Sequence, residues 1–280
     1  MIHKIYPCLW FTDQANEAAH FYADVFDDVK ITSSNPVVTM LEVSGETIML
    51  LNDNRNQPIN PSVSLFVLSN DQEELSKYWH KLSSGGQIHM ALDQYPWSKF
   101  YGMCTDSYGV SWQIMLGNIG DQKIVPSLMF TNNTNGKAEA AIQEYTSLFP
   151  NSAIVSLNRY NQGEGEQEGN IKHAQFIVNG FWMTAMDSSG DHSFDFNEGV
   201  SFVVNCDTQE EIDLLWNHFT KKGEENMCGW CKDQFGVSWQ IVPSILGSLM
   251  SDPANAGKVV QAFMKMRKFD IAKLVAAAGR

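Results

Sequence analysis

Two stretches of the sequence carry the same polar side chain inside an otherwise apolar strand. Residues 106–114 read DSYGVSWQI and residues 233–241 read DQFGVSWQI, so seven of nine positions are identical across 233 − 106 = 127 residues. The shared amides are Gln113 and Gln240. An amide among apolar side chains must find a hydrogen-bond partner. Each glutamine is therefore a candidate for orienting a bound molecule, or else for a bond to a hydroxyl or backbone group of a neighbouring strand.

A second candidate region is the segment HMALDQYPWSKFYG, residues 89–102, which is rich in aromatic side chains. Trp97 and Tyr101 could fold over the mouth of a cavity as a lid, because large aromatic side chains bury much area on contact with a ligand. The alternative is that these side chains only pack at the edge of the sheet. The second half of the chain lacks a matching segment, so its site need not be equivalent.

Alternation along the strands predicts which side chains face the same interior. Ser111 shares a side with Gln113, and we take Trp10 to back onto a helix, which turns Leu9 and Phe11 inward. The predicted substrate-binding residues are Leu9, Phe11, Trp97, Tyr101, Ser111, Gln113, Phe130, Ser238 and Gln240. No residue is assigned a catalytic role.

The elements that position these residues follow an internal repeat. PCLWFT (7–12) matches PSLMFT (126–131), and SLFVLSNDQEELSKYW (64–79) matches SFVVNCDTQEEIDLLW (201–216). Each copy reads twice as one strand, one helix and three strands. Helical spacing predicts helices at 15–26 and 72–82 of the first copy. Two such βαβββ modules can pair and curl into a half-open mixed β-barrel with helices outside.

We therefore predict an α+β fold with two tandem domains and a helical tail. The expected boundaries are 1–118 for the first domain, 119–124 for a linker, 125–250 for the second domain and 251–280 for the tail. The tail begins with Asp252 and Pro253, a helix start. It either packs on the second domain or forms a subunit contact.

The amino-acid sequences of these segments resemble those of a known family. PCLWF (7–11), NEGVSFVV (197–204), CGWCKDQFGVSWQIVP (228–243) and DPANAGKVVQAFMKMRKFDI (252–271) are similar to the PhnB-like branch of the vicinal oxygen chelate superfamily, which includes glyoxalases and bleomycin-resistance proteins. The branch carries the name 3-demethylubiquinone-9 3-methyltransferase. A Rossmann-type methyltransferase needs a Gly-rich turn between a strand and a helix. The cluster GEGEQEG (163–169) is acidic and indicates a surface loop instead.

The resemblance also implies where a divalent metal would bind. Metal-dependent members place one ligand early in the first strand and one in the last strand, and these slots hold Pro7 and Gln113 in the first copy and Pro126 and Gln240 in the second. Proline has no ligand atom in its side chain, and an amide oxygen is a weak neutral ligand. The middle slots, near 49–50, 63–64, 183–185 and 200–202, hold no histidine or carboxylate. We predict no metal site of this type and no cofactor.

The charge of the chain limits its partners. Its formal net charge is −13 at pH 7, which repels phosphate backbones and anionic membrane surfaces. The sequence shows no signal peptide and no apolar run long enough to span a bilayer, so a cytoplasmic location is expected.

The leading hypothesis is a metal-free protein that binds a small apolar or aromatic molecule through an amide. The alternatives are a metal-dependent lyase, isomerase or dioxygenase, and a scaffold that binds no ligand. Whether the protein is an enzyme stays open, as do its ligand and the openness of the second pocket. The expected assembly is a homodimer or a covalent pseudo-dimer formed by the tandem copies.

Overall fold

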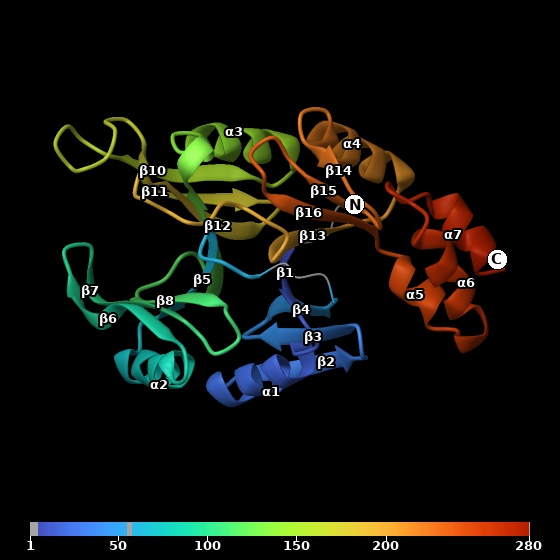
Figure 1. Ribbon diagram of the computed structural model, residues 1–280, viewed down its shortest axis with the longest axis horizontal. Helices are drawn as coiled ribbons and strands as arrows, with labels where there is room; N and C mark the ends of the chain where they lie inside the picture. The colour runs from blue at the N-terminus through green and yellow to red at the C-terminus, as the bar shows by residue number, and fades with distance from the viewer. Residues whose placement is uncertain (1–4, 55–57, 280) are drawn as a thin grey trace. The chain divides into compact units, whose positions relative to one another are not determined.

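The computed structural model describes residues 5–54 and 58–279, and its elements repeat a βαβββ order four times (Figure 1). Modules one and two comprise β1 (Tyr6–Phe11), α1 (Ala15–Val25), β2 (Val29–Ser34), β3 (Val38–Val43), β4 (Glu46–Asn52), β5 (Val63–Ser69), α2 (Gln72–Ser83), β6 (Gln87–Tyr95), β7 (Ser98–Thr105) and β8 (Ser111–Leu116). Modules three and four comprise β9 (Ile124–Phe130), the short 3-10 helix η1 (Asn132–Thr134), α3 (Ala138–Leu148), β10 (Ala153–Arg159), β11 (Ile171–Val178), β12 (Phe181–Asp187), β13 (Val200–Cys206), α4 (Gln209–Thr220), β14 (Glu224–Glu225), β15 (Trp230–Lys232) and β16 (Ser238–Pro243). The tail adds α5 (Leu246–Met250), α6 (Pro253–Phe263) and α7 (Ile271–Ala277).

The chain forms two compact units. The larger unit spans residues 6–200 and contains modules one to three, and the smaller unit contains residues 201–279 with module four and the tail. The α+β class, the four modules and the helical tail predicted from the sequence are confirmed.

Modules two and three share one eight-stranded sheet in the larger unit, in the order β10-β11-β12-β9-β5-β8-β7-β6. Within each module the first and last strands are parallel, as in β5 with β8 and β9 with β12. The two first strands, β5 and β9, pair antiparallel with Val63 opposite Leu128. The sheet therefore continues across the predicted domain boundary, and the boundaries at 118 and 125 stay a prediction.

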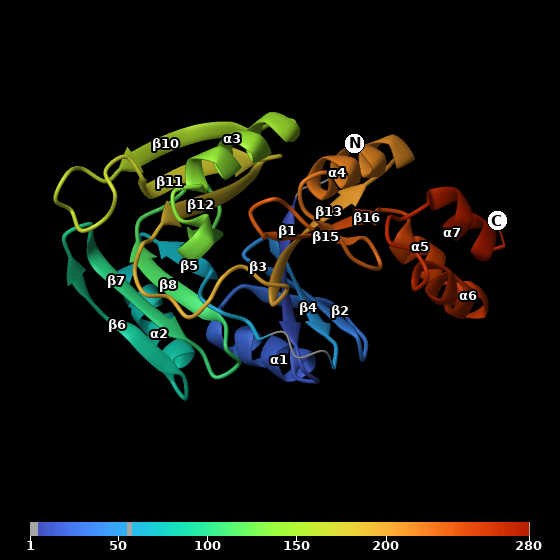
Figure 2. The same ribbon diagram turned by 45° about the horizontal axis from the view of Figure 1, so that its top comes forward.

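Helices α2 and α3 lie on the same face of this sheet. Gly102 of β7 faces α2, since a Cβ atom at Gly102 would meet the Trp79 ring. At the other end, Asp187 of β12 accepts hydrogen bonds from the backbone N–H groups of Gly136 and Ala138, at the start of α3. The sheet curves with both helices outside (Figure 2). We call the face opposite the helices the inner face.

The other modules form four-stranded arrangements of the same kind. In module one the strand order is β1-β4-β3-β2 and α1 packs on it, and in module four the order is β13-β16-β15-β14 with α4. The tail packs on module four, because Cys228 and Gly229 donate backbone hydrogen bonds to Met266 and Arg267. The Gln209 side chain of α4 also donates a hydrogen bond to the backbone oxygen of Phe269 and accepts one from the backbone N–H of Ile271, at the start of α7. No helix among the described residues is long and apolar enough to cross a membrane.

A buried aspartate organises the turn between β7 and β8. One carboxylate oxygen of Asp106 accepts the backbone N–H groups of Tyr108 at 2.8 Å and Val110 at 3.0 Å. The other accepts the Trp112 indole N–H at 2.8 Å and the Tyr22 hydroxyl at 2.9 Å. Burial raises the pKa of the Asp106 carboxyl, and these four donors oppose that rise.

Module four repeats this arrangement around Asp233. Its carboxylate accepts the backbone N–H groups of Phe235 and Val237 and the Trp239 indole N–H at 2.9 Å. The turns also share a glycine with φ of +89°, Gly109 in one and Gly236 in the other, where a side chain would be strained. The near-identity of the two DxxGVSWQI segments therefore has a structural cause in both copies.

We expect Asp106→Ala to lower the free energy of unfolding by more than about 3 kcal/mol, since it leaves several buried donors without an acceptor. Asp93→Ala changes an exposed aspartate of β6 and should alter the free energy of unfolding by less than about 0.5 kcal/mol. Urea unfolding followed by circular dichroism measures both. Equal effects of the two substitutions would contradict the role of Asp106.

Candidate functional site

The inner face of the eight-stranded sheet carries a row of hydroxyl side chains. Strand register places Thr105 opposite Ser111, Ser64 opposite Ser127, and Ser127 opposite Thr184. Ser111 lies beside Ser64, because Leu65 and Trp112, the next residues along β5 and β8, are paired. The row thus crosses five strands. Ser64, Ser111, Ser127 and Thr184 are all buried.

Gln113 lies at the centre of a short hydrogen-bond chain on this face. The Tyr101 hydroxyl donates to the Gln113 side-chain oxygen at 2.7 Å, and the Gln113 side-chain nitrogen donates to the Ser64 hydroxyl at 2.7 Å. Burial raises the pKa of the Tyr101 hydroxyl well above its ordinary value, so this group stays a donor. The bond to Ser64 is the neighbouring-strand hydroxyl contact that the sequence allowed. The amide still has one N–H and one lone pair for a further partner.

The smaller unit repeats part of this chain. The Gln240 side-chain nitrogen donates to the Ser201 hydroxyl at 3.0 Å, and Ser201 lies opposite Ser238. Trp230 of β15 lies opposite Gln240, as Met103 of β7 lies opposite Gln113. In the sequence Cys228 therefore corresponds to Tyr101, but it lies before β15 and its thiol is 3.7 Å from the backbone oxygen of Phe263 in the tail.

Three of the predicted binding residues lie on the helix side of their strands, whereas we expected them on the side of Gln113. Leu9 pairs with Leu50 and Phe11 with Asn52, and the Asn52 side chain accepts the backbone N–H of Ala15 at the start of α1. Phe130 pairs with Asp187, which caps α3. Leu9, Phe11 and Phe130 thus face helices and do not join Gln113. The expected orientation was wrong because both faces of β1 are apolar and buried, and because Ser127 is the single polar side chain of β9, so alternation carried little information.

The predicted lid is a hairpin. Residues 87–95 and 98–105 are the strands β6 and β7, and Pro96 and Trp97 form the turn between them. Trp97 is 59% exposed, stacks on Tyr95 with ring centroids 5.1 Å apart, and meets Tyr101 edge-on at 5.6 Å. The aromatic group therefore adjoins the Gln113 chain through Tyr101.

Apolar side chains from both modules surround this chain. Phe66, Leu68 and Val125 form a buried cluster with Tyr101 and Ile119. Partly buried side chains pack against it: Met90, Tyr95, Met103, Met115 and Trp182. Sequence reasoning missed Ser64 as the partner of Gln113, and it missed Ser127, Thr184 and Trp182 as residues of the same inner face. The signal that could have found them was the alternation in 182–186, read together with the pairing of modules two and three.

The inner-face donors do not suit a divalent cation. The implied metal slots that reach this face hold Ser64, Gln113 and Thr184, which offer neutral oxygens already engaged in hydrogen bonds. Pro126 pairs with Leu65 and faces the helices. In the described chain no three histidine, cysteine or acidic side chains gather as a metal-binding group. Zinc, nickel and iron favour imidazole, thiolate or carboxylate ligands.

The four central strands present only uncharged side chains to the inner face. These are Ser111, Gln113 and Met115 of β8, Ser64, Phe66 and Leu68 of β5, Val125, Ser127 and Met129 of β9, and Trp182, Thr184 and Met186 of β12. A charged group placed there would lose its hydration without gaining an ionic partner. The face suits an uncharged molecule with one or two polar atoms.

Comparison with known proteins gives the family and the fold. The family described as 3-demethylubiquinone-9 3-methyltransferase matches residues 3–115 and 122–242. A Bacillus cereus PhnB protein, assigned provisionally as a 3-demethylubiquinone-9 3-methyltransferase, is 34% identical over 41% of this chain and 100% of its own, with a TM-score of 0.39. Glyoxalase I from Zea mays is 12% identical over 87% of this chain and 92% of its own, with a TM-score of 0.58. The plant enzyme supports the tandem fold alone. No curated protein matches the chain.

A double-mutant cycle tests the Tyr101–Gln113 bond. We expect Tyr101→Phe and Gln113→Leu to be coupled by about 1 kcal/mol in the free energy of unfolding, because each removes the same buried hydrogen bond. Tyr95→Phe is the control, since the Tyr95 hydroxyl bonds to the backbone of Ala91 instead. Its coupling to Gln113→Leu should be near zero, and an equal coupling for both tyrosines would contradict the assignment.

Proposed function

The chain belongs to the family described as 3-demethylubiquinone-9 3-methyltransferase, within the glyoxalase superfamily, and from that premise we propose that it binds a small, apolar or aromatic molecule on the inner face of its eight-stranded sheet. The proposal requires no divalent metal of the kind that metal-dependent members of the superfamily use. The observation that carries it is the Tyr101–Gln113–Ser64 chain, a fixed polar group among partly buried methionine and aromatic side chains.

The polar chain gives the ligand a defined orientation. Gln113 is held from both ends, so its remaining donor and acceptor point in fixed directions. A ligand atom bonded there would replace water without disturbing the bonds to Tyr101 and Ser64. Apolar rings of the ligand would contact Met103, Met115 and Trp182, whose thioether and indole groups adapt to irregular shapes.

The methyl-transfer activity in the family description finds no support in the residues of this chain. The glycine cluster at 163–169 connects the antiparallel strands β10 and β11, not a strand to a helix. Strand β5 leads into α2 through Asn70 and Asp71, and Asp71 caps the helix. A dinucleotide-type or methyl-donor turn of the Rossmann kind requires glycines at such a junction. Neither segment therefore provides a methyl-donor site of that kind.

The first prediction of this proposal concerns an uncharged fluorescent probe, Nile red. We expect saturable binding at one site of the larger unit, unchanged by EDTA. Trp97→Ala should weaken binding about tenfold, or about 1.4 kcal/mol, through loss of aromatic contact area. Leu214→Ala in α4, where Leu214 is 55% exposed, is the matched control and should leave the affinity unchanged. Absence of saturable binding would favour the scaffold alternative.

The second prediction concerns metal content. Untagged protein purified without chelator should contain less than about 0.1 equivalents of zinc, nickel, iron or manganese by elemental mass spectrometry, because the inner-face donors are neutral hydroxyls and one amide. Stoichiometric amounts of any of these metals would overturn the proposal and place the protein among metal-dependent enzymes.

A further inference from the structure

One row of the inner face carries three side chains that can bind a metal, two through soft thioether sulfurs and one through an imidazole nitrogen. Met129 of β9 lies opposite Met186 of β12. Strands β11 and β12 are antiparallel, and Ala174 of β11 lies opposite Ala185 of β12. The next pair in this register places His173 opposite Met186. The row therefore contains an imidazole and two thioethers on three adjacent strands. It lies one row from Ser127 and Thr184, away from Gln113.

These three side chains point to the inner face together. The residues that alternate with them, Ala174, Phe130 and Asp187, are buried on the helix side, and Asp187 bonds to the start of α3. His173, Met186 and Met129 are partly exposed. Paired residues of neighbouring strands have Cβ atoms about 4.5–5.5 Å apart. A methionine has three rotatable bonds, so two sulfur atoms can turn toward one point beside the imidazole.

The imidazole of His173 is free to act as a ligand. Among the described residues it has no hydrogen-bond or ion-pair partner, in contrast to His89 and His192, which bond to Thr105 and Ser188. Burial lowers the pKa of His173 below its ordinary value, which keeps the ring neutral at neutral pH. The ring is partly exposed on the inner face, so a bound ion can reach its nitrogen atoms.

The composition of the row selects the kind of ion. Thioether sulfur and imidazole nitrogen suit copper(I), whereas carboxylate, carbonyl and water oxygens suit magnesium, calcium and manganese. None of the three side chains, those of Met129, Met186 and His173, is a carboxylate. A monovalent ion also adds less charge to an uncharged surface than a divalent ion does.

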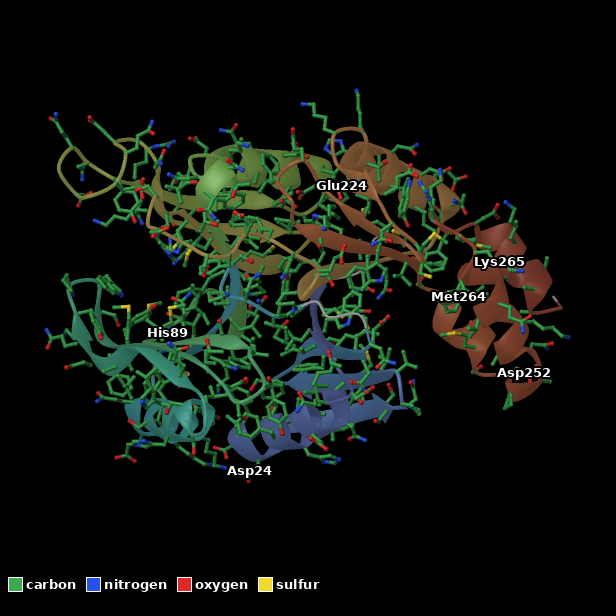
Figure 3. All side chains as sticks on the ribbon, viewed as in Figure 1. Asp24, His89, Glu224, Asp252, Met264 and Lys265 are labelled. Carbon is green, nitrogen blue, oxygen red and sulfur yellow. The ribbon has the colours of Figure 1, made fainter. Side chains whose placement is uncertain are left out.

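A second methionine pair on the same face provides an internal comparison. Met90 lies opposite Met103 on β6 and β7. The nearest imidazole in the sequence is His89 on the same hairpin (Figure 3), and its ring nitrogen is 2.7 Å from the Thr105 hydroxyl. This pair therefore offers two sulfur atoms, as the first row does, but its nearest imidazole is held by a hydrogen bond to Thr105.

We propose that His173, Met186 and Met129 bind one soft monovalent cation, copper(I) or silver(I), at a site separate from the Gln113 chain. The proposal stands independently of ligand binding at Gln113. It assigns a role to the unpartnered histidine and to the two methionines that the aromatic cluster around Tyr101 does not use.

The test uses the full chain carrying Cys228→Ser, because the other four cysteines are buried and Cys228 is partly exposed. Silver(I) is titrated by calorimetry, and copper(I) is measured anaerobically in competition with bicinchoninate. We expect one equivalent bound with a dissociation constant below about 1 μM. Met129→Leu, Met186→Leu and His173→Gln should each weaken binding at least about tenfold, and leucine preserves the side-chain volume.

The matched controls are Met90→Leu and Met103→Leu, which should bind silver(I) as the parent does. The melting temperature of every variant establishes that the fold is intact, and Nile red binding by Met129→Leu, Met186→Leu and His173→Gln establishes that the Gln113 site is intact. X-ray absorption of the copper(I) form should show sulfur and nitrogen neighbours together. The proposal is overturned if Met129→Leu and Met186→Leu bind silver(I) unchanged, or if the controls lose binding equally.

Discussion

The Asp106 carboxylate decides which way the strand that carries Gln113 faces. One oxygen closes the turn before β8 through Tyr108 and Val110, and the other holds the Trp112 indole on the helix side. Because neighbouring residues of a strand point to opposite faces, fixing Trp112 outward fixes Gln113 inward. A slip of one residue in β8 would put the amide against α2 and the indole on the inner face, and it would break both sets of bonds.

The same interaction connects modules one and two of the larger unit. The Tyr22 hydroxyl of α1 bonds to Asp106, so module one is tied to the last hairpin of module two. Tyr22 also packs edge-on against Trp112 at 5.5 Å. A buried carboxylate is costly unless its oxygens are filled, and here four donors from two modules fill them. No acidic side chain of β8, β5, β9 or β12 points to the inner face, so the central strands of that face are uncharged.

Local patterns in the sequence predicted the modules well, and the long-range pairing not at all. The helices at 15–25 and 72–83 bury one side, with Ala18, Ala19 and Tyr22 on the first, as 3.6-residue spacing requires. Alternation placed Ser111 and Gln113 correctly, because β8 has a polar and an apolar side. Strand β1 is apolar on both sides and β9 has one polar side chain, Ser127, so Leu9, Phe11 and Phe130 could not be oriented. Strands β5 and β9 are the first strands of two different modules, and they pair along their edges. The alternation of side chains within a strand does not encode which strands pair.

The two DxxGVSWQI segments share the residues that set their fold, and they differ in the residues that surround the glutamine side chain. Both keep the aspartate, the glycine, the indole and the bond from glutamine to a serine of the first strand. Module two adds a tyrosine to the amide oxygen and a long aromatic hairpin, whereas module four has Cys228 at the corresponding sequence position and strands β14 and β15 of two and three residues. A repeat preserved for ligand binding would retain the groups around the amide. This repeat retains the groups that set the strand's orientation, so the identity of the two segments reports a shared folding requirement. The differences around them support our proposal that the ligand binds at module two.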